Sequence, residues 1–116
     1  MNKRAIGTAY EKLAAAYLEQ HGMKILEYNY RLRSGEIDLI ARDGRYLVFV
    51  EVKFRADDLQ GTPLEAVDAR KQRTIIRTAQ QYLLRHGYGM ETPCRFDVVG
   101  ICKEVITHIE NAFWGN

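Results

Sequence analysis

Hydrophobic positions in the first 20 residues of the chain recur with the period of a helix. Ile6, Tyr10, Leu13 and Tyr17 are separated by four, three and four positions. This spacing places the four side chains on one side of a helix, because about 3.6 residues make one turn. The pattern therefore predicts an amphipathic helix over residues 3–20 with these four residues on its buried face.

A second helical pattern lies in the middle of the chain. The segment Thr62-Pro63-Leu64-Glu65 is a capping box with proline at the first helical position, which predicts a helix start. The pattern continues to His86-Gly87, where glycine favours a helix end, with a bend expected near residues 68–69. The expected core face of this helix comprises Ile75, Ile76, Ala79 and Leu83.

Shorter apolar runs predict five strands. They cover residues 24–30, 36–42, 45–54, 94–101 and 105–109. Between the second and third strands, Asp43-Gly44 favours a two-residue hairpin turn. The order of helix, three strands, helix and two strands indicates an α/β fold, in which helices flank a mixed central sheet. A length of 116 residues suits a single domain spanning residues 1–116.

Composition narrows the class of protein. Hydrophobic residues make up 47% of the chain, which is enough for one core. The basic N-terminus is not followed by an apolar signal core, and the longest apolar run, Tyr46–Val50, is far shorter than a membrane span. We therefore expect a cytoplasmic protein that does not act at a membrane.

The net charge of +2 is too small to indicate a partner, but the basic residues are unevenly distributed. Residues 69–90 contain five basic side chains and no acidic one. Arg70, Arg73 and Arg77 fall on one face of the predicted helix, which favours contacts with nucleic-acid phosphates. The alternative, a solvated helix face without a ligand, stays open at this point.

Two carboxylates and a lysine fall on the same face of the predicted hairpin. Side chains alternate between the faces of a strand, and a turn at Asp43-Gly44 pairs Glu36 with Glu51. Asp38 then lies diagonal to Glu51, roughly 7–8 Å away, with Lys53 on the same face. Charges inside an otherwise apolar strand are costly unless they are paired or bind a metal.

This set of side chains predicts a metal site. Carboxylates that reach towards each other can hold one hard cation, whose oxygen ligands lie about 2.0–2.6 Å away. The alternative is a solvated surface hairpin, in which Glu51 and Lys53 form an ordinary ion pair. Glu11, at the edge of the apolar stripe of the first helix, either looks into the same site or lies on a solvated flank.

Other polar residues have structural interpretations. Asp97 interrupts the apolar run Phe96–Val99, so we expect its carboxylate to face the site or to hydrogen-bond a buried partner. His21, His86 and His108 show no metal-ligand spacing, and we interpret all three as incidental.

Two segments resemble a known superfamily. Gly35–Ile40 and Leu47–Lys53 resemble the PD-(D/E)xK motif of restriction-endonuclease-like enzymes, with Ile37 where the motif often has proline. With Glu11 and Arg95–Val99, they make the chain similar to the bacterial YraN family, which is related to archaeal Holliday-junction resolvases. The resemblance implies a restriction-endonuclease-like fold.

The resemblance covers residues 7–109 and also implies a metal centre. Asp38 and Glu51 would bind Mg²⁺ or Mn²⁺, and the carbonyl of Val52 would be a further ligand. Both ions prefer oxygen donors, which these three residues supply.

The resemblance further implies roles for residues around the metal. Lys53 would hold the attacking water and stabilise charge on the phosphate, and a lysine beside two carboxylates should stay protonated. Glu11 would orient the water or assist a second cation. Lys71 matches a basic position of the family and would point towards the scissile region.

Two functions are compatible with these observations. The first is a metal-dependent endonuclease that acts on DNA, including branched or damaged DNA in repair or recombination. The second is a non-catalytic nucleic-acid-binding module that retains the nuclease fold. Both functions imply a nucleic-acid partner. Whether the protein forms a homodimer stays open.

Overall fold

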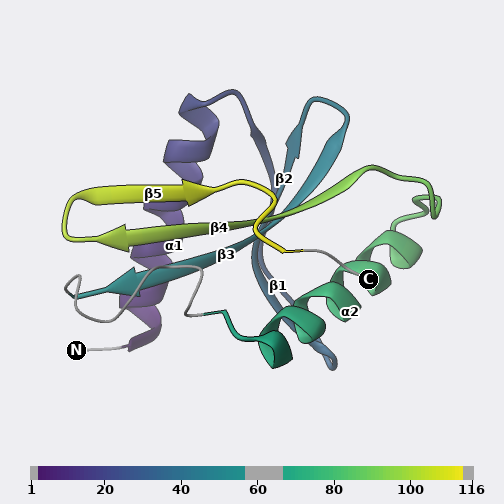
Figure 1. Cartoon of the computed structure of the whole chain (residues 1–116), viewed down its shortest axis with the longest axis horizontal. Helices are drawn as coiled ribbons and strands as arrows, with labels where there is room; N and C mark the ends of the chain where they lie inside the picture. Colours follow the sequence, from purple (N-terminus) through teal and green to yellow (C-terminus); the bar gives the residue numbers. More distant parts are fainter. Residues whose placement is uncertain (1–2, 57–66, 114–116) are drawn as a thin grey trace.

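In the computed structural model, which describes residues 3–56 and 67–113, five strands form one sheet in chain order (Figure 1). The elements are α1 (Lys3–Gln20), β1 (Lys24–Leu32), β2 (Gly35–Asp43), β3 (Tyr46–Arg55), α2 (Ala69–Arg85), β4 (Cys94–Cys102) and β5 (Val105–Ile109). The pair β3–β4 is parallel and is connected through α2, whereas the other neighbouring pairs are antiparallel. The predicted α/β order and mixed sheet are confirmed.

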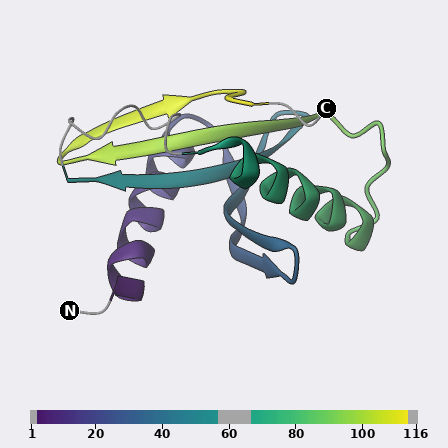
Figure 2. The same ribbon diagram turned by 60° about the horizontal axis from the view of Figure 1, so that its bottom comes forward.

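The sheet has a core on each face, as its alternating side chains require. Val48 and Val50 of β3 pack in the cluster that contains α1, whereas Leu47 and Phe49 pack in the cluster that contains α2. Burial on both faces explains why β3 reads as a continuous apolar run. Figure 2 shows α1 and α2 on either side of the β1–β2 pair.

The buried face of α1 differs from the predicted one. Ala14, Ala15 and Leu18 are buried, whereas Leu13 is 51% exposed and Tyr10 is half-buried. Small alanine side chains let the helix approach the sheet closely, and the larger residues lie at the flanks. Since Glu11 precedes Ala14, Ala15 and Leu18 by three, four and seven positions, it belongs to the side of α1 that faces the sheet.

The start of α2 also differs from the prediction. Asp68 is the N-cap, with an extended backbone (φ −73°, ψ 173°), and its side chain accepts the Lys71 N–H at 2.9 Å. The predicted start at residues 62–65 lies outside the described residues. Val67 and Asp68 are not helical. The prediction of one helix that continues through a bend near residues 68–69 was therefore wrong, because α2 begins at Ala69. Within the described ranges, no helix is long and apolar enough to cross a membrane.

The core face of α2 is only partly as expected. Its buried residues are Ile75, Thr78, Ala79 and Tyr82. Ile76 and Leu83 are half-buried instead, beside an apolar pocket. Thr78 is tolerated in the core because its hydroxyl donates to the Thr74 carbonyl at 2.9 Å.

A glycine brings α2 close to β2. A Cβ atom on Gly35 would clash with Cγ2 of Thr74 and would lie 3.1 Å from Oγ1 of Thr78. The missing side chain therefore permits the contact that places the N-terminal half of α2 over β2.

The register of the β2–β3 hairpin is shifted by two residues from the predicted one. Asp43 pairs with Tyr46, and the turn is Gly44-Arg45, with Gly44 at φ +60°. A shift of two residues preserves the faces, because side chains alternate with period two. The predicted same-face placement therefore survives, although the predicted pairing of Glu36 with Glu51 was wrong.

The paired part of β2 and β3 is short, and the two strands then separate. Their last pair is Leu39 with Val50, after which β2 continues beside β1 and β3 beside β4 as far as Arg55. Within the part of the chain that the structure describes, β3 after Val50 therefore has one edge without a neighbouring strand. We refer to residues 51–55 of this edge as the open edge of β3.

Candidate active site

Asp38 and Glu51 lie side by side where β2 and β3 separate. The backbone N–H of Val52 donates to Oδ2 of Asp38 at 2.8 Å, and the Asp38 and Glu51 side chains hydrogen-bond each other. The two carboxyl groups are therefore in direct contact, closer than the diagonal placement predicted from the sequence. A carboxyl–carboxyl hydrogen bond requires one of the two groups to carry a proton.

The proton resides on Asp38. Burial, with the neighbouring charge of Glu51 as the next cause, raises the pKa of Asp38 to about 9. Burial would also raise the pKa of Glu51, but the proton of Asp38 and the ammonium of Lys71 outweigh it and hold this pKa below the ordinary value. At neutral pH and without a metal, a proton thus occupies the space between two inward-facing carboxyl groups.

Two lysines approach the same carboxylate oxygen. Nζ of Lys71 lies 2.7 Å and Nζ of Lys53 lies 3.3 Å from Oε2 of Glu51, whose side chain is 3% exposed. Both contacts are ion pairs by distance, and the closer contact with Lys71 helps to lower the pKa of Glu51. Two ammonium groups therefore balance the charge of the buried Glu51 carboxylate.

The two lysines respond differently to this environment. Burial lowers the pKa of Lys53, and the attraction of Glu51 does not restore it because the charge of Lys71 acts in the same direction as burial. Burial also acts against Lys71, but contact with Glu51 outweighs it and raises the pKa. The expectation for Lys53 considered only the carboxylates, whereas the structure adds burial and a second ammonium.

Glu11 reaches the site from α1, on the other side of the sheet. Its carboxyl group shares hydrogen bonds with Asn29 and Asp38, and burial raises its pKa. The structure thus brings Glu11, Asp38, Glu51 and Lys53 together at one place, as the sequence predicted. It does not place Glu11 on a solvated flank.

Asn29 is a site residue that the sequence analysis missed. It holds Glu11 and lies in β1 with a positive φ of 52°. The available signal was an asparagine between two tyrosines of a strand, since asparagine is depleted in strands but tolerates this backbone conformation.

A cleft of about 370 Å³ opens over the carboxylates. It is lined by Glu36, Asp38, Glu51, Asp68, Arg70, Lys71, Thr74 and Ile75. The arginines predicted as one group are therefore divided. Arg70 lines the cleft, whereas Arg73 and Arg77 are exposed on α2 and are not part of the lining.

The donor set fits a hard divalent cation. Among the described residues, no three His, Cys, Asp or Glu side chains are arranged to hold a metal ion by themselves, which argues against a closed zinc site. Mg²⁺ instead commonly takes one or two carboxylates and completes its shell with water and phosphate oxygens. Since Val52 directs its N–H to Asp38, its carbonyl faces the same edge of β3, where it would be a third oxygen donor.

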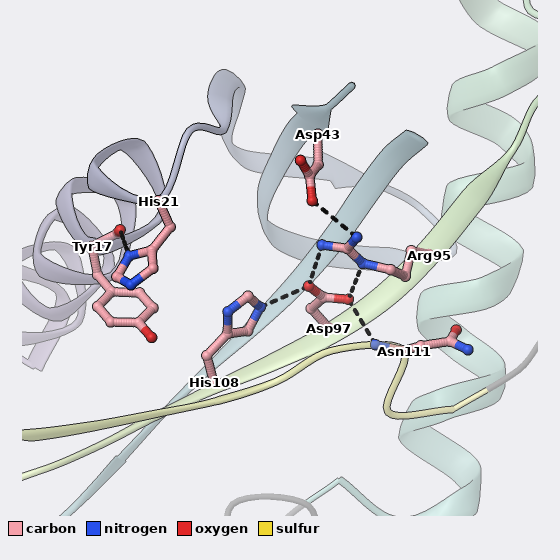
Figure 3. A network of polar contacts seen from close by, with 7 residues as sticks. All are labelled: Tyr17, His21, Asp43, Arg95, Asp97, His108 and Asn111. Carbon is pink, nitrogen blue, oxygen red and sulfur yellow. Dashed lines mark hydrogen bonds and ion pairs between the residues drawn. The ribbon is translucent and has the colours of Figure 1, made fainter. Parts of the chain in front are cut away.

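A second buried carboxylate has a structural role (Figure 3). Asp97 of β4 is fully buried and accepts from Nε of Arg95 at 3.0 Å, from the backbone N–H of Asn111 at 3.0 Å and from Nε2 of His108 at 2.7 Å. Arg95 also contacts Asp43, the last residue of β2, at 3.0 Å. The interpretation of His108 as incidental was therefore wrong, because it is a partner of a buried charge.

Asp97 lies on the face of the sheet opposite to Glu51. It pairs with Val50, whose side chain packs in the α1 cluster, and paired residues share a face. Of the two interpretations of Asp97, the buried partner is correct. His21 and His86 contact the carbonyls of Tyr17 and Tyr82 and do not approach the site.

The chain is similar to known proteins over nearly its whole length. The uncharacterised protein family UPF0102 matches residues 10–101. A UPF0102 protein of Lachnoclostridium phytofermentans is 52% identical over 97% of this chain and 96% of its own length. A UPF0102 protein of Chlorobium chlorochromatii is 50% identical over 94% of this chain and 91% of its own length. With these matches across the whole fold and the site, the chain belongs to the UPF0102 family.

Proposed function

We propose that this protein is a metal-dependent nuclease that hydrolyses phosphodiester bonds in DNA. The observation that carries the proposal is the contact between Asp38 and Glu51 at the floor of an open cleft, flanked by Lys53 and Lys71. Two carboxyl groups buried against each other repel when both are ionised, and a cation between them removes that cost. The same arrangement supports the resemblance to the restriction-endonuclease-like superfamily and the YraN family.

In this proposal Asp38, Glu51 and the Val52 carbonyl would hold Mg²⁺ or Mn²⁺. When bound, such an ion polarises the phosphoryl oxygen and acidifies a bound water. Asp38 gives up its proton when the site is loaded, so metal affinity rises with pH.

The lysines act on the substrate in different ways. Lys53 orients the attacking water and, in its ammonium form, stabilises the charge that develops on the phosphate, against the lowering of its pKa by burial. Lys71, with its raised pKa, stays charged at the cleft and attracts the phosphate. Glu11, held by Asn29, accepts a hydrogen bond from the water on the α1 side of the site.

The DNA backbone would lie along the N-terminal half of α2. Arg70 lines the cleft, and the exposed Arg73 and Arg77 continue the basic surface away from it. Such contacts are with phosphates and not with base edges, so they favour a particular shape of substrate over a particular sequence. Branched or damaged DNA fits this mode of recognition.

One observation favours a non-catalytic nucleic-acid-binding module as the second candidate. Without metal, Glu51 is neutralised by two ammonium groups and Asp38 keeps its proton. With Glu11 also at the site, the formal charges of two carboxylates and two ammonium groups then balance without a cation, and the arginines of α2 can bind phosphates without any chemistry. A retained but inactive site of this kind binds DNA equally well in the presence of EDTA.

The proposal is tested with purified protein and end-labelled linear, flapped and four-way DNA, each with Mg²⁺, Mn²⁺ or EDTA. We expect metal-dependent cleavage of at least one substrate. Lys53→Ala should reduce the rate by about 10²–10³-fold with nearly unchanged binding, since its effect is felt mainly in the transition state. Lys24→Ala, which removes an exposed lysine at the start of β1, is the matched control. Binding without cleavage by any metal would establish the second candidate instead.

A further inference from the structure

An exposed aromatic pair lies on the α1 side of the open edge of β3. The rings of Tyr10 and Phe54 are stacked, with centroids 4.0 Å apart and planes inclined by 22°. Tyr10 is half-buried and packs against the α1 cluster, whereas Phe54 is 45% exposed. Tyr10 thus supports Phe54 from one side, while 45% of Phe54 stays exposed.

Both aromatic residues are sequence neighbours of candidate site residues. Phe54 follows Lys53 on β3, and Tyr10 precedes Glu11 on α1. Consecutive Cα atoms are about 3.8 Å apart, and consecutive side chains of a strand point to opposite faces. Lys53 therefore projects to the α2 side of the open edge, where the cleft lies, and Phe54 to the α1 side.

We propose that Phe54, supported by Tyr10, stacks on an unpaired nucleobase next to the scissile phosphate, so that the substrate is single-stranded or splayed DNA. This inference rests on the proposed function. A strand that crosses the open edge places its phosphate at Lys53 and the adjacent base at Phe54. Both faces of a base inside a duplex are already covered by its neighbours, so only an unpaired or extruded base has a face to offer.

The size of the exposed surface distinguishes a base from a protein partner. Among the side chains of α1 that the structure describes, the large exposed apolar one is Leu13, one helical turn after Tyr10. A whole aromatic side chain buries about 150–250 Å². Partly exposed Phe54 and Leu13 therefore fall short of the roughly 450 Å² of apolar area, about 56–58% of about 800 Å², that each partner contributes to a stable protein interface. A single planar base matches the available surface.

The test combines protein variants with DNA variants. Binding of a labelled single strand, and of the same strand with one abasic position moved along it, is measured by fluorescence anisotropy in EDTA. Removing the base that stacks on Phe54 should weaken wild-type binding by about 5–150-fold. Phe54→Ala should weaken binding of the intact strand by a similar factor and should no longer respond to the abasic position. Phe54→Trp should retain the affinity, whereas Phe54→Leu should not, because leucine is apolar but cannot stack.

The control is Leu84→Ala, which removes a side chain that is 71% exposed and lies about 20 Å along α2 from Lys71. It should leave single-strand affinity unchanged. If Phe54→Ala or Phe54→Leu bound the single strand with full affinity, stacking would be refuted. If Phe54→Ala changed the molecular mass measured by light scattering, this surface would instead bind a second copy of the chain. Binding is measured without metal, so the two proposals can fail separately. If the protein cleaves DNA but Phe54→Ala binds as wild type does, only the base contact is rejected. If Phe54→Ala weakens binding but no DNA is cleaved, only the nuclease activity is rejected.

Discussion

Asp38 links three observations at the site. It accepts the Val52 N–H, it shares a hydrogen bond with Glu51, and burial raises its pKa to about 9. A proton and a divalent cation therefore compete for the same carboxyl groups. The protonation of this residue determines both the stability of the metal-free protein and its affinity for metal.

Asp38→Asn should stabilise the metal-free protein at alkaline pH. Below the ordinary value of 3.8, Asp38 is protonated in both the folded and the unfolded state, so its pKa shift has no effect. Between this value and about 9 only the folded wild type retains the proton, and its stability falls as pH rises, by at most 1.4 kcal/mol per pH unit, roughly. Asparagine does not ionise and can still accept from Val52 and donate to Glu51. Urea unfolding in EDTA across this pH range should show that the difference in free energy of unfolding between Asp38→Asn and wild type grows with pH.

The same variant should lose the response to metal. Wild type should melt at a higher temperature in Mg²⁺, with about 2.7 kcal/mol of added stability at 100 times the dissociation constant. Glu36→Gln is the control, because Glu36 lines the same cleft but pairs with Arg31, which is 60% exposed. Its metal response should persist, and its stability should change by less than about 1 kcal/mol. An undiminished response in Asp38→Asn would place the metal elsewhere.

Among the elements, α2 connects the site to the rest of the molecule. Its buried face fixes it on the sheet, and the close approach at Gly35 brings its N-terminal half over β2. Lys71 and Arg70 then reach the cleft, while Arg73 and Arg77 face solvent. One helix thus supplies both an ammonium at the carboxylates and a basic surface outside the cleft.

The double variant Arg73→Ala/Arg77→Ala should weaken DNA binding without changing the site. Each phosphate contact releases counterions, so losing two should make the slope of log affinity against log salt shallower by about one to two units. Cleavage at saturating DNA should remain close to that of wild type. A control is Arg85→Ala, which removes an exposed arginine from the other end of α2. An unchanged slope in the double variant would return Arg73 and Arg77 to a solvated helix face.

For the whole molecule, the Asp97 network joins segments that are distant in the chain (Figure 3). Arg95 and His108 connect Asp97 of β4 to the β2–β3 turn and to β5, and the Asn111 backbone closes the network after β5. Since Asp43 flanks the hairpin turn, the network also helps to fix the β2–β3 hairpin that presents the site from the opposite face.

Asp97→Asn should destabilise the fold by about 3–5 kcal/mol at neutral pH, because Arg95 loses its buried counter-charge. Burial acts to raise the pKa of Asp97, but its hydrogen bonds from His108, Arg95 and Asn111 outweigh it and lower the pKa below 3.8. The stabilisation is therefore present above 3.8 and is lost as pH falls through the lower folded-state pKa. As pH is lowered, the free energy of unfolding should therefore fall less steeply in the variant than in wild type.

The control for this prediction is Asp43→Asn, which removes a partner of the same arginine at a position whose side chain is 38% exposed. It should cost less than about 1 kcal/mol. Equal losses in the two variants would show that Asp97 has no special role in the network.

The sequence by itself determined the order of the elements, the mixed sheet and the common face of Asp38, Glu51 and Lys53. These features depend on local periods, and a period of two tolerates a register error of two residues without moving a side chain to the other face. Packing decided what local periods do not encode. It set the buried face of α1, the start of α2 at Ala69, the contact of Lys71 with Glu51 and the approach of Glu11, which Asn29 holds. Each of these depends on how closely a helix fits the sheet, which is a property of side chains far apart in the sequence. The catalytic, metal-binding and nucleic-acid-binding roles stay predictions for the experiments above.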